Sequence, residues 1–176
     1  MIFSEITIRG AFVIEPEHLE DERGHFARLF SAEEFRSRGL NARVDQCSYS
    51  YNARRGTLRG LHYQARPHGE CKLVRCTRGA AYDAAVDLRP ESPTYLCSWG
   101  VDLTAENRLA VYLPEGVAHG LLTLVDDTEI YYQMSAPYVP DAARGVRWDD
   151  PTFGIQWPAS PRIMSDRDRQ YPDYVP

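Results

Sequence analysis

Short apolar segments separated by turn residues make up most of the chain. Between residues 71 and 135 these segments are five to nine residues long and read CKLVRC, AYDAAVDL, YLCSWGVDL, RLAVYL, LLTLV and EIYYQMS. The residues between them are rich in Gly, Pro, Asn and Asp, which favour turns. In AYDAAVDL, Tyr82 and Val86 alternate with Asp83 and Asp87, as in a strand with one apolar face. Because no helical segment separates these strands, the pattern predicts an antiparallel sandwich or barrel.

One helix is predicted before these strands. The segment FSAEEFRSRGL has Ser31 and Glu34 at the spacing of a capping box, and Gly39 stands where a helix would end. We expect a short helix here. The C-terminal segment SDRDRQYPDYVP is polar and contains proline, which by itself predicts a frayed end.

The segment GTLRGLHYQ, residues 56–64, reads as a strand that carries unusual polar side chains. Strict alternation would put Arg59 and His62 on opposite faces of the sheet. Gly60 lies between them and could permit a bulge, which would bring both side chains to one face.

Composition and charge narrow the function classes. The 176 residues suffice for one domain, which we expect to span residues 1–176. A net charge of -5 argues against a nucleic-acid partner. The chain lacks a signal-peptide pattern and the run of about 20 apolar residues that spans a bilayer, so we expect a cytoplasmic protein with no membrane partner. Its four cysteines have no metal-site spacing, and we expect them to be reduced and packed.

The segment LPEGVAHG resembles the second motif of the cupin superfamily, because Pro114, Gly116 and His119 have the spacing P-x-G-x-x-H. The cupin fold is a small double-sheet antiparallel barrel, in agreement with the strand pattern. Metal-binding cupins also carry an H-x-H pair, since a divalent ion needs three or four converging ligands. No two histidines of this chain are separated by a single residue. We therefore expect no metal.

Six ordered segments resemble successive blocks of the dTDP-4-dehydrorhamnose 3,5-epimerase family: DERGHF, GTLRGLHYQ, CKLVRCTRGAAYDAAVDLRPESPTY, LPEGVAHG, EIYYQMSAPYVPDAARGVRWDDP and FGIQWP. The resemblance runs from about residue 3 to about residue 170. It implies an all-β cupin-type barrel, or jelly roll, with a few short helices. It also implies a homodimer that uses no cofactor and acts on a nucleotide-linked 4-keto-6-deoxyhexose in deoxysugar biosynthesis.

The resemblance also assigns catalytic roles. Inversion beside a keto group needs a base on one face of the sugar ring, an acid on the other, and a donor for the enolate oxygen. His62 matches the family's base and Asp168 the carboxylate that pairs with it, which would give the C-terminal segment a reason to be ordered. Lys72 matches the lysine that stabilises the enolate, and Tyr132 the acid. Lys72 shares its predicted strand face with apolar residues, and Tyr131 must point away from Tyr132.

Further residues match positions that bind the nucleotide sugar. Arg23 and Arg59 match diphosphate contacts, and Phe26 and Tyr138 match aromatics near the base. The segment with Arg23 and Phe26 is expected to reach across the dimer interface. The remaining candidates for substrate binding are Gln46, Ser48 and His119.

Three residues depart from the family pattern. Ser48 stands where many members have Asn, Arg28 where many have Glu, and Ala143 where Glu often precedes RG. These departures leave open the identity of the nucleotide sugar and whether C3, C5 or both are inverted. Two other classes also stay open, a metal-dependent cupin oxygenase and a non-catalytic sugar-binding barrel.

Overall fold

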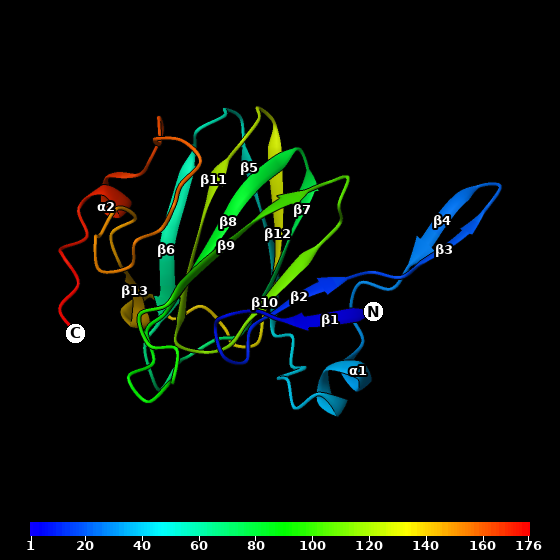
Figure 1. Cartoon of the computed structure of the whole chain (residues 1–176), viewed down its shortest axis with the longest axis horizontal. Coiled ribbons are helices and arrows are strands. Elements are labelled where there is room, and N and C mark those ends of the chain that lie inside the picture. Colours follow the sequence, from blue (N-terminus) through cyan, green and yellow to red (C-terminus); the bar gives the residue numbers. More distant parts are fainter.

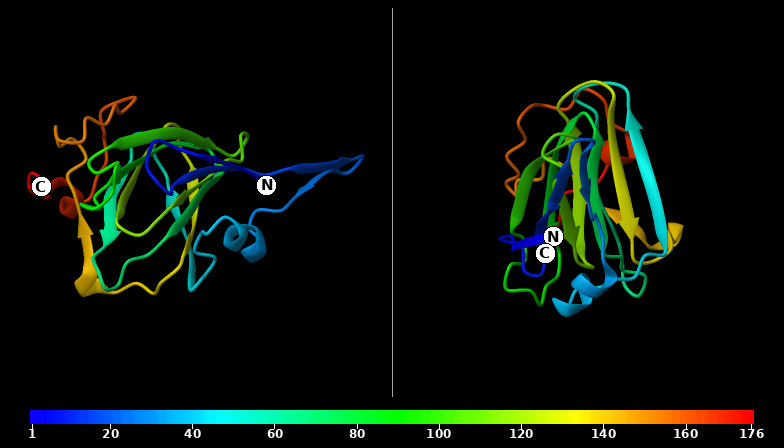
Figure 2. Two further views of the ribbon diagram at one scale, coloured as in Figure 1. Left: turned by 60° about the horizontal axis from the view of Figure 1, so that its bottom comes forward. Right: turned by 90° about the vertical axis from the view of Figure 1, so that its right-hand side faces the viewer.

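Two antiparallel sheets face each other and enclose the main hydrophobic core (Figures 1 and 2). We describe them from a computed structural model of residues 1–176. The larger sheet contains, in spatial order, β1 (Ile2–Glu5), β2 (Phe12–Glu15), β10 (Ala110–Leu113), β7 (Lys72–Arg78), β12 (Thr128–Met134) and β5 (Gln46–Asn52). The smaller sheet contains β13 (Ala143–Gly145), β6 (Leu58–Gln64), β11 (Val117–Thr123), β8 (Ala80–Asp87) and β9 (Ser98–Thr104). The predicted all-β antiparallel class is confirmed.

A hairpin of β3 (His18–Asp21) and β4 (Gly24–Ala27) projects away from both sheets (Figure 1). We call it the arm. Its side chains include Leu19 and Phe26, which are 69% and 68% exposed. Large apolar side chains that project this far into solvent are typical of a surface that contacts a partner.

The helical content is small. The α-helices are α1 (Ala32–Ser37) and α2 (Asp166–Arg169), and a 3-10 turn, η1, covers Pro140–Ala142. The predicted cap of α1 is confirmed, because Ser31 Oγ accepts a hydrogen bond from Glu34 N at 3.4 Å and Gly39 adopts a φ of +71° after the helix. Neither helix is long and apolar enough to span a membrane.

Strand β8 has the predicted alternation, yet both of its faces are covered. Ala81 and Ala85 point into the main core, whereas Val86 and Leu88 belong to a second cluster with Phe153 on the outer side of the smaller sheet. The C-terminal third of the molecule supplies this outer cover. An antiparallel strand is thus buried on two sides, with Asp83 and Asp87 at 1% and 0% exposure.

The segment before β9 differs from the prediction, which extended that strand back to Tyr95. Residues 93–96 form turns, and Leu96 has a φ of +65°. The reason is Asp87, whose carboxylate accepts hydrogen bonds from the hydroxyls of Ser92 at 2.6 Å and Thr94 at 2.7 Å. These bonds hold the chain in a turn that propensity alone did not reveal.

The C-terminal segment is ordered, so the frayed end predicted from its composition is wrong. Tyr174 N donates to Asp150 Oδ2 at 2.6 Å, and the Tyr174 ring lies 5.3 Å from that of Phe153. Asp168 is only 4% exposed. The segment lies beside β6 (Figure 1), where it forms one wall of a cavity described below.

A bulge in β6 changes which side chains face the barrel. From Arg59 to His62 strand β6 advances three residues, while its partner β11 advances two, from Leu121 to His119. The extra residue shifts the parity of the strand. Arg59 and His62 therefore both line the barrel, and Leu61 packs in the outer cluster.

Gly60 makes the bulge possible. It has a φ of +119°, and a Cβ at this position would lie 2.6 Å from the Cα of Gly120. No other residue combines this backbone conformation with so little volume. Glycine is thus required here for two reasons: the backbone has a positive φ, and β11 lies too close for a side chain.

We expect Gly60→Ala to lower the free energy of unfolding more than Gly39→Ala, by about 1–3 kcal/mol, as typical for overpacking. Gly39 is the control, since its φ of +71° is also one that other residues rarely adopt, while nothing lies within 4 Å of an added Cβ. Urea denaturation of the two variants measures the difference. Equal losses of stability in the two variants would show that the close approach of Gly120 does not add to the effect of the substitution.

Candidate active site

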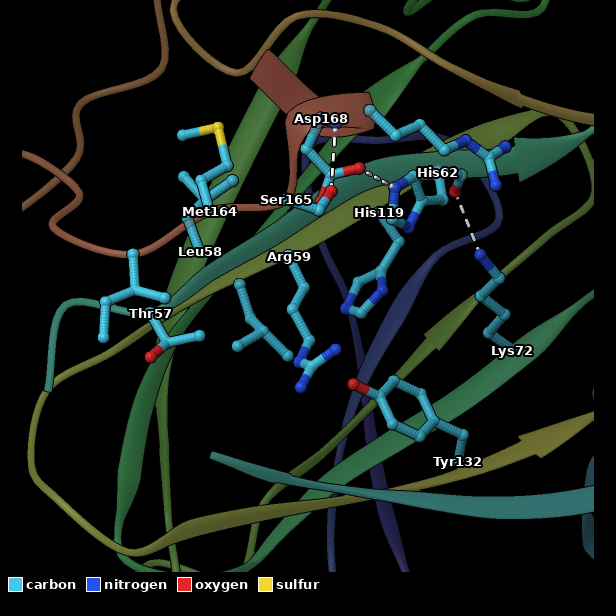
Figure 3. Close-up of a pocket in the computed structure, with 13 residues that line it drawn as sticks. Thr57, Leu58, Arg59, His62, Lys72, His119, Tyr132, Met164, Ser165 and Asp168 are labelled. Atoms are coloured by element: carbon cyan, nitrogen blue, oxygen red, sulfur yellow. Dashed lines mark hydrogen bonds and ion pairs between the residues drawn. The ribbon is translucent and has the colours of Figure 1, made fainter. Parts of the chain in front are cut away.

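A cavity of about 570 Å³ lies inside the barrel, between the two sheets and the C-terminal segment (Figure 3). Six of the eleven site residues predicted from the sequence line it: Arg59, His62, Lys72, His119, Tyr132 and Asp168. The other lining residues are Thr57, Leu58, Leu121, Ile163, Met164, Ser165 and Arg167. Strands β6, β7, β11 and β12 thus bring together polar residues that are far apart in the sequence.

His62 and Asp168 form the predicted pair. His62 Nε2 lies 2.6 Å from Asp168 Oδ1, across 106 residues of sequence. Ser165 caps α2 by accepting from Asp168 N at 3.1 Å, which fixes the carboxylate at the barrel wall. With Nε2 engaged, Nδ1 is the ring atom of His62 that is left to exchange a proton in the cavity.

The charge of Asp168 is maintained despite its burial. Burial by itself would raise the pKa of Asp168, but the hydrogen bond and charge of His62, the backbone N–H of Gly60 and the hydroxyl of Ser165 lower it below the usual value of 3.8. The carboxylate therefore stays ionised at neutral pH and can stabilise a protonated His62.

Lys72 approaches His62 from β7. Its Nζ donates to the carbonyl oxygen of His62 at 2.9 Å and lies 3.3 Å from Glu70 Oε1. Burial lowers the pKa of Lys72 from its usual value of 10.5, and the carboxylate of Glu70 partly opposes this effect. The predicted apolar face is confirmed, since Val74 and Cys76 on the same strand face belong to the main core. An ammonium has three donors, so one remains for a ligand.

Tyr132 reaches the cavity from the opposite sheet. Its hydroxyl lies 3.1 Å from Ser50 Oγ on the neighbouring strand β5. Burial raises the pKa of Tyr132 to about 12, and Ser50 and Arg59 limit the increase. The phenol therefore stays protonated at neutral pH, as an acid requires. Tyr131 is not among the residues that line the cavity.

His119 has a buried partner that the sequence did not reveal. Its Nε2 lies 2.7 Å from Asp83 Oδ2, and the other carboxylate oxygen of Asp83 has no hydrogen-bond partner. His119 is aligned with His62 on the adjacent strand, and its ring lies 6.1 Å from that of Tyr132. Alternation indicated a carboxylate on this face of β8, but only the pairing of β8 with β11 identifies its partner.

Arg59 is held by Asn52, another residue that the sequence analysis missed. Its Nε donates to Asn52 Oδ1 at 2.7 Å, and the rest of the guanidinium points into the cavity (Figure 3). Tyr171 was missed as well. Its ring lies 6.2 Å from that of His62 and its hydroxyl accepts from Arg167 Nε at 2.8 Å.

The remaining predicted site residues do not line the cavity. Arg23 and Phe26 lie on the projecting arm, where Arg23 pairs with Asp21. Ser48 is the β5 residue aligned with Tyr132, so its side chain shares the inner face of the sheet. Gln46 accepts a hydrogen bond from the backbone N–H of Tyr138, which is 56% exposed.

No group of three or more His, Cys, Asp or Glu side chains is placed to hold a metal ion. The two histidines of the cavity are instead each paired with one carboxylate. The cavity is lined by an imidazole paired with a carboxylate, by a phenol and by three cationic side chains, those of Arg59, Lys72 and Arg167. This set suits proton transfer at a carbon atom whose negative charge must be stabilised.

Known proteins share both the sequence and the architecture of this chain. The family model dTDP-4-dehydrorhamnose 3,5-epimerase matches residues 5–175. A relative of that name from Sinorhizobium fredii is 41% identical over 173 residues, covering 98% of this chain and 89% of the relative.

Solved structures of similar proteins agree with this family match. The dTDP-4-dehydrorhamnose 3,5-epimerase of Bacillus anthracis with bound TDP and PPi has a TM-score of 0.94 and 36% identity, covering 98% of this chain and 99% of its own. A 3'-monoepimerase of Streptomyces bikiniensis in complex with dTDP-quinovose has a TM-score of 0.87 and 38% identity, covering 96% of this chain and 85% of its own.

A match of the family model over nearly the whole chain, similarity at 41% identity and a shared cupin-type barrel therefore lead to one conclusion. The chain belongs to the dTDP-4-dehydrorhamnose 3,5-epimerase family.

Proposed function

We propose that the protein inverts C3, C5 or both carbons of a dTDP-linked 4-keto-6-deoxyhexose by acid-base catalysis through an enolate. The observation that carries this proposal is the arrangement of His62 and Tyr132, which enter one cavity from opposite sheets (Figure 3). A base and an acid on opposite sides of a ring are what inversion needs, since removal and return of a proton on one face leaves the carbon unchanged.

The chemical step begins at Nδ1 of His62, which takes the proton from the carbon beside the keto group. The electron pair of the C–H bond forms the C=C bond of the enolate, and the π electrons of the C=O bond move onto the keto oxygen, which becomes negatively charged. The free donor of Lys72 stabilises that oxygen. Asp168, bonded to Nε2, stabilises the imidazolium without taking its proton. Tyr132 then protonates the carbon from the other face, and exchange with solvent returns both groups to their starting states.

The nucleotide is held by cations and aromatic rings. Arg59 presents its guanidinium to the diphosphate, to which a planar cation can donate two parallel hydrogen bonds. In this proposal His119 contacts the sugar, Gln46 and Ser48 contact the nucleotide sugar, and Tyr138 packs near the nucleobase. The bound TDP of the Bacillus anthracis relative supports a thymidine nucleotide.

We further propose a homodimer in which the arm of each subunit completes the site of the other. The exposure of Leu19 and Phe26 on the projecting arm supports this assembly. Arg23 and Phe26 would then contact the nucleotide bound by the partner. A cytoplasmic location fits the four free cysteines, which such a compartment keeps reduced.

Incubation with dTDP-4-keto-6-deoxyglucose in heavy water tests the reaction directly. We expect deuterium at the inverted carbons, two for double inversion and one for a single-site enzyme, counted by mass spectrometry. His62→Ala should lower exchange by about 10²–10⁴, the usual contribution of general base catalysis. His68→Ala is the control, since that histidine is exposed and should not matter. Absence of exchange in the wild type with any nucleotide-linked 4-keto sugar would refute the proposal.

The pKa of Lys72 predicts the alkaline limit of activity. Because burial lowers this pKa, and Lys72 must be charged to stabilise the enolate, kcat/KM should fall at a pH below the usual 10.5 of lysine. Glu70 raises the pKa, so Glu70→Gln should move the alkaline limb to lower pH. Glu91→Gln, which removes an exposed carboxylate paired with Arg66, should leave the limb in place. A limb that moves upward in Glu70→Gln would contradict this role of Lys72.

Mixed dimers test whether sites are shared between subunits. His62→Ala is one parent, and the double variant Arg23→Ala/Phe26→Ala is the other. Random association should restore about a quarter of the wild-type sites, because each mixed dimer has one site with an intact base and an intact arm. Mixing His62→Ala with Asp168→Ala should restore nothing, since both residues belong to one subunit's part of the site. Recovery in neither mixture, with dimers present by ultracentrifugation, would rule out the shared site.

A further inference from the structure

Strand β5 lies at the edge of the larger sheet and its inner face borders the cavity. The side chains at positions 48, 50 and 52 share the face of Tyr132, because residue 48 is aligned with it across the β5–β12 pair. None of the three lines the cavity itself. Ser50 and Asn52 nevertheless contact two residues that do.

Asn52 holds the guanidinium of Arg59. It is 2% exposed, and its Oδ1 accepts from Arg59 Nε at 2.7 Å. Arginine only donates, so this bond fixes which end of the amide faces it. The amide nitrogen then points the other way, where it donates to the carbonyl oxygen of Thr128 at 3.2 Å and to Ser50 Oγ at 3.5 Å. Asn52 is thereby fixed on both sides.

Ser50 contacts the hydroxyl of Tyr132 at 3.1 Å. A serine hydroxyl has one proton to donate. Since Asn52 donates to Ser50 Oγ, the serine proton is free to point at the phenol oxygen. A donor at that oxygen stabilises the phenolate that forms when Tyr132 gives up its proton. This agrees with the effect of Ser50 on Tyr132, whose pKa it lowers.

We infer that Ser50 and Asn52 are positioning residues of the reaction, Ser50 for the acid Tyr132 and Asn52 for Arg59. The inference rests on the proposed function. Neither residue lines the cavity. Ser50 instead orients the phenol and stabilises its anion, and Asn52 directs both the serine hydroxyl and the guanidinium. The two side chains that they hold, Arg59 and Tyr132, point toward one another in the cavity (Figure 3).

The test compares exchange with inversion. Proton removal by His62 does not need Ser50, so Ser50→Ala should still take up deuterium from heavy water. The weakened acid should return fewer protons on the opposite face, and more deuterium should return on the original face. We expect the ratio of exchange to inversion, measured by mass spectrometry and NMR, to rise about tenfold, as for loss of one hydrogen bond to a charged group.

Three variants make this result specific. Ser50→Thr keeps the hydroxyl and should restore the wild-type ratio. Thr77→Ala removes an exposed hydroxyl of β7 that bonds to Glu129, and should not change it. In a Tyr132→Phe background, Ser50→Ala should have no further effect on the ratio, because its partner is absent. Equal loss of exchange and inversion in Ser50→Ala, or the same tenfold change in both backgrounds, would overturn the inference.

Asn52 is tested through substrate binding. Asn52→Ala should raise KM for the nucleotide sugar, because Arg59 loses its support, and should also raise the ratio of exchange to inversion by releasing Ser50. Ser50→Ala should raise only the ratio. An Asn52→Ala variant with unchanged KM and ratio would remove Asn52 from the inference.

A second measurement does not depend on activity. A fluorinated tyrosine at position 132 titrates at lower pH than tyrosine and can be followed by fluorine NMR. Ser50→Ala should raise the pKa of this group, since the donor to its anion is lost, and an unchanged pKa would refute the role of Ser50. If the wild type exchanges no deuterium with any 4-keto sugar, the proposed function fails, while this titration still decides whether Ser50 acts on Tyr132.

Discussion

The carboxylate of Asp168 stabilises both the bulge in β6 and the orientation of His62, on which the site depends. One oxygen bonds to His62 at 2.6 Å, and the other accepts from the backbone N–H of Gly60 at 3.2 Å. The same side chain thus supports the bulge that turns Arg59 and His62 to one face and fixes the ring of the proposed base. Because Asp168 comes from the C-terminal segment, that segment is part of the barrel wall rather than a tail.

Burial disfavours the charged forms of two cavity residues, Lys72 and Tyr132, whereas Asp168 stays ionised. Burial lowers the pKa of Lys72 and raises that of Tyr132 to about 12, so desolvation acts against the charged form of each. An enolate oxygen beside Lys72 would reverse this for the lysine, because an opposite charge at short range favours the ammonium. The cavity is therefore better suited to the proposed intermediate than to the neutral ketone, which is the condition for catalysis.

Local patterns predicted much of the fold, because strands and caps are local. The cap of α1 by Ser31 and the apolar face beside Lys72 both follow from spacing along the chain. The bulge at Gly60 could be suspected, since glycine permits it, but its presence depends on β11 approaching closely.

The site was less predictable because its contacts are distant in sequence. Asp83 and His119 are 36 residues apart and meet only through the pairing of β8 and β11. Strand β5 was not predicted because its sequence shows little apolar periodicity. Its polar and aromatic residues face the barrel interior or the solvent rather than a hydrophobic core. The base–carboxylate pair of His62 and Asp168 came from resemblance to a family, since no rule of spacing joins residues 106 positions apart.

The two proposed proton-transfer groups are held by different parts of the molecule. His62 on β6 depends on the C-terminal segment through Asp168, whereas Tyr132 on β12 depends on the edge strand β5 through Ser50. A substitution that removes the contact to Tyr132 should therefore leave the pair of His62 and Asp168 intact. In an enzyme of this kind, exchange without inversion is the expected result of damage to the acid alone, because the base can return the proton to the face from which it came. Under the proposed function, whether this protein inverts one carbon or two depends on how well Tyr132 reaches each of them. Residues that hold Tyr132 from outside the cavity belong in that question as much as residues that touch the sugar.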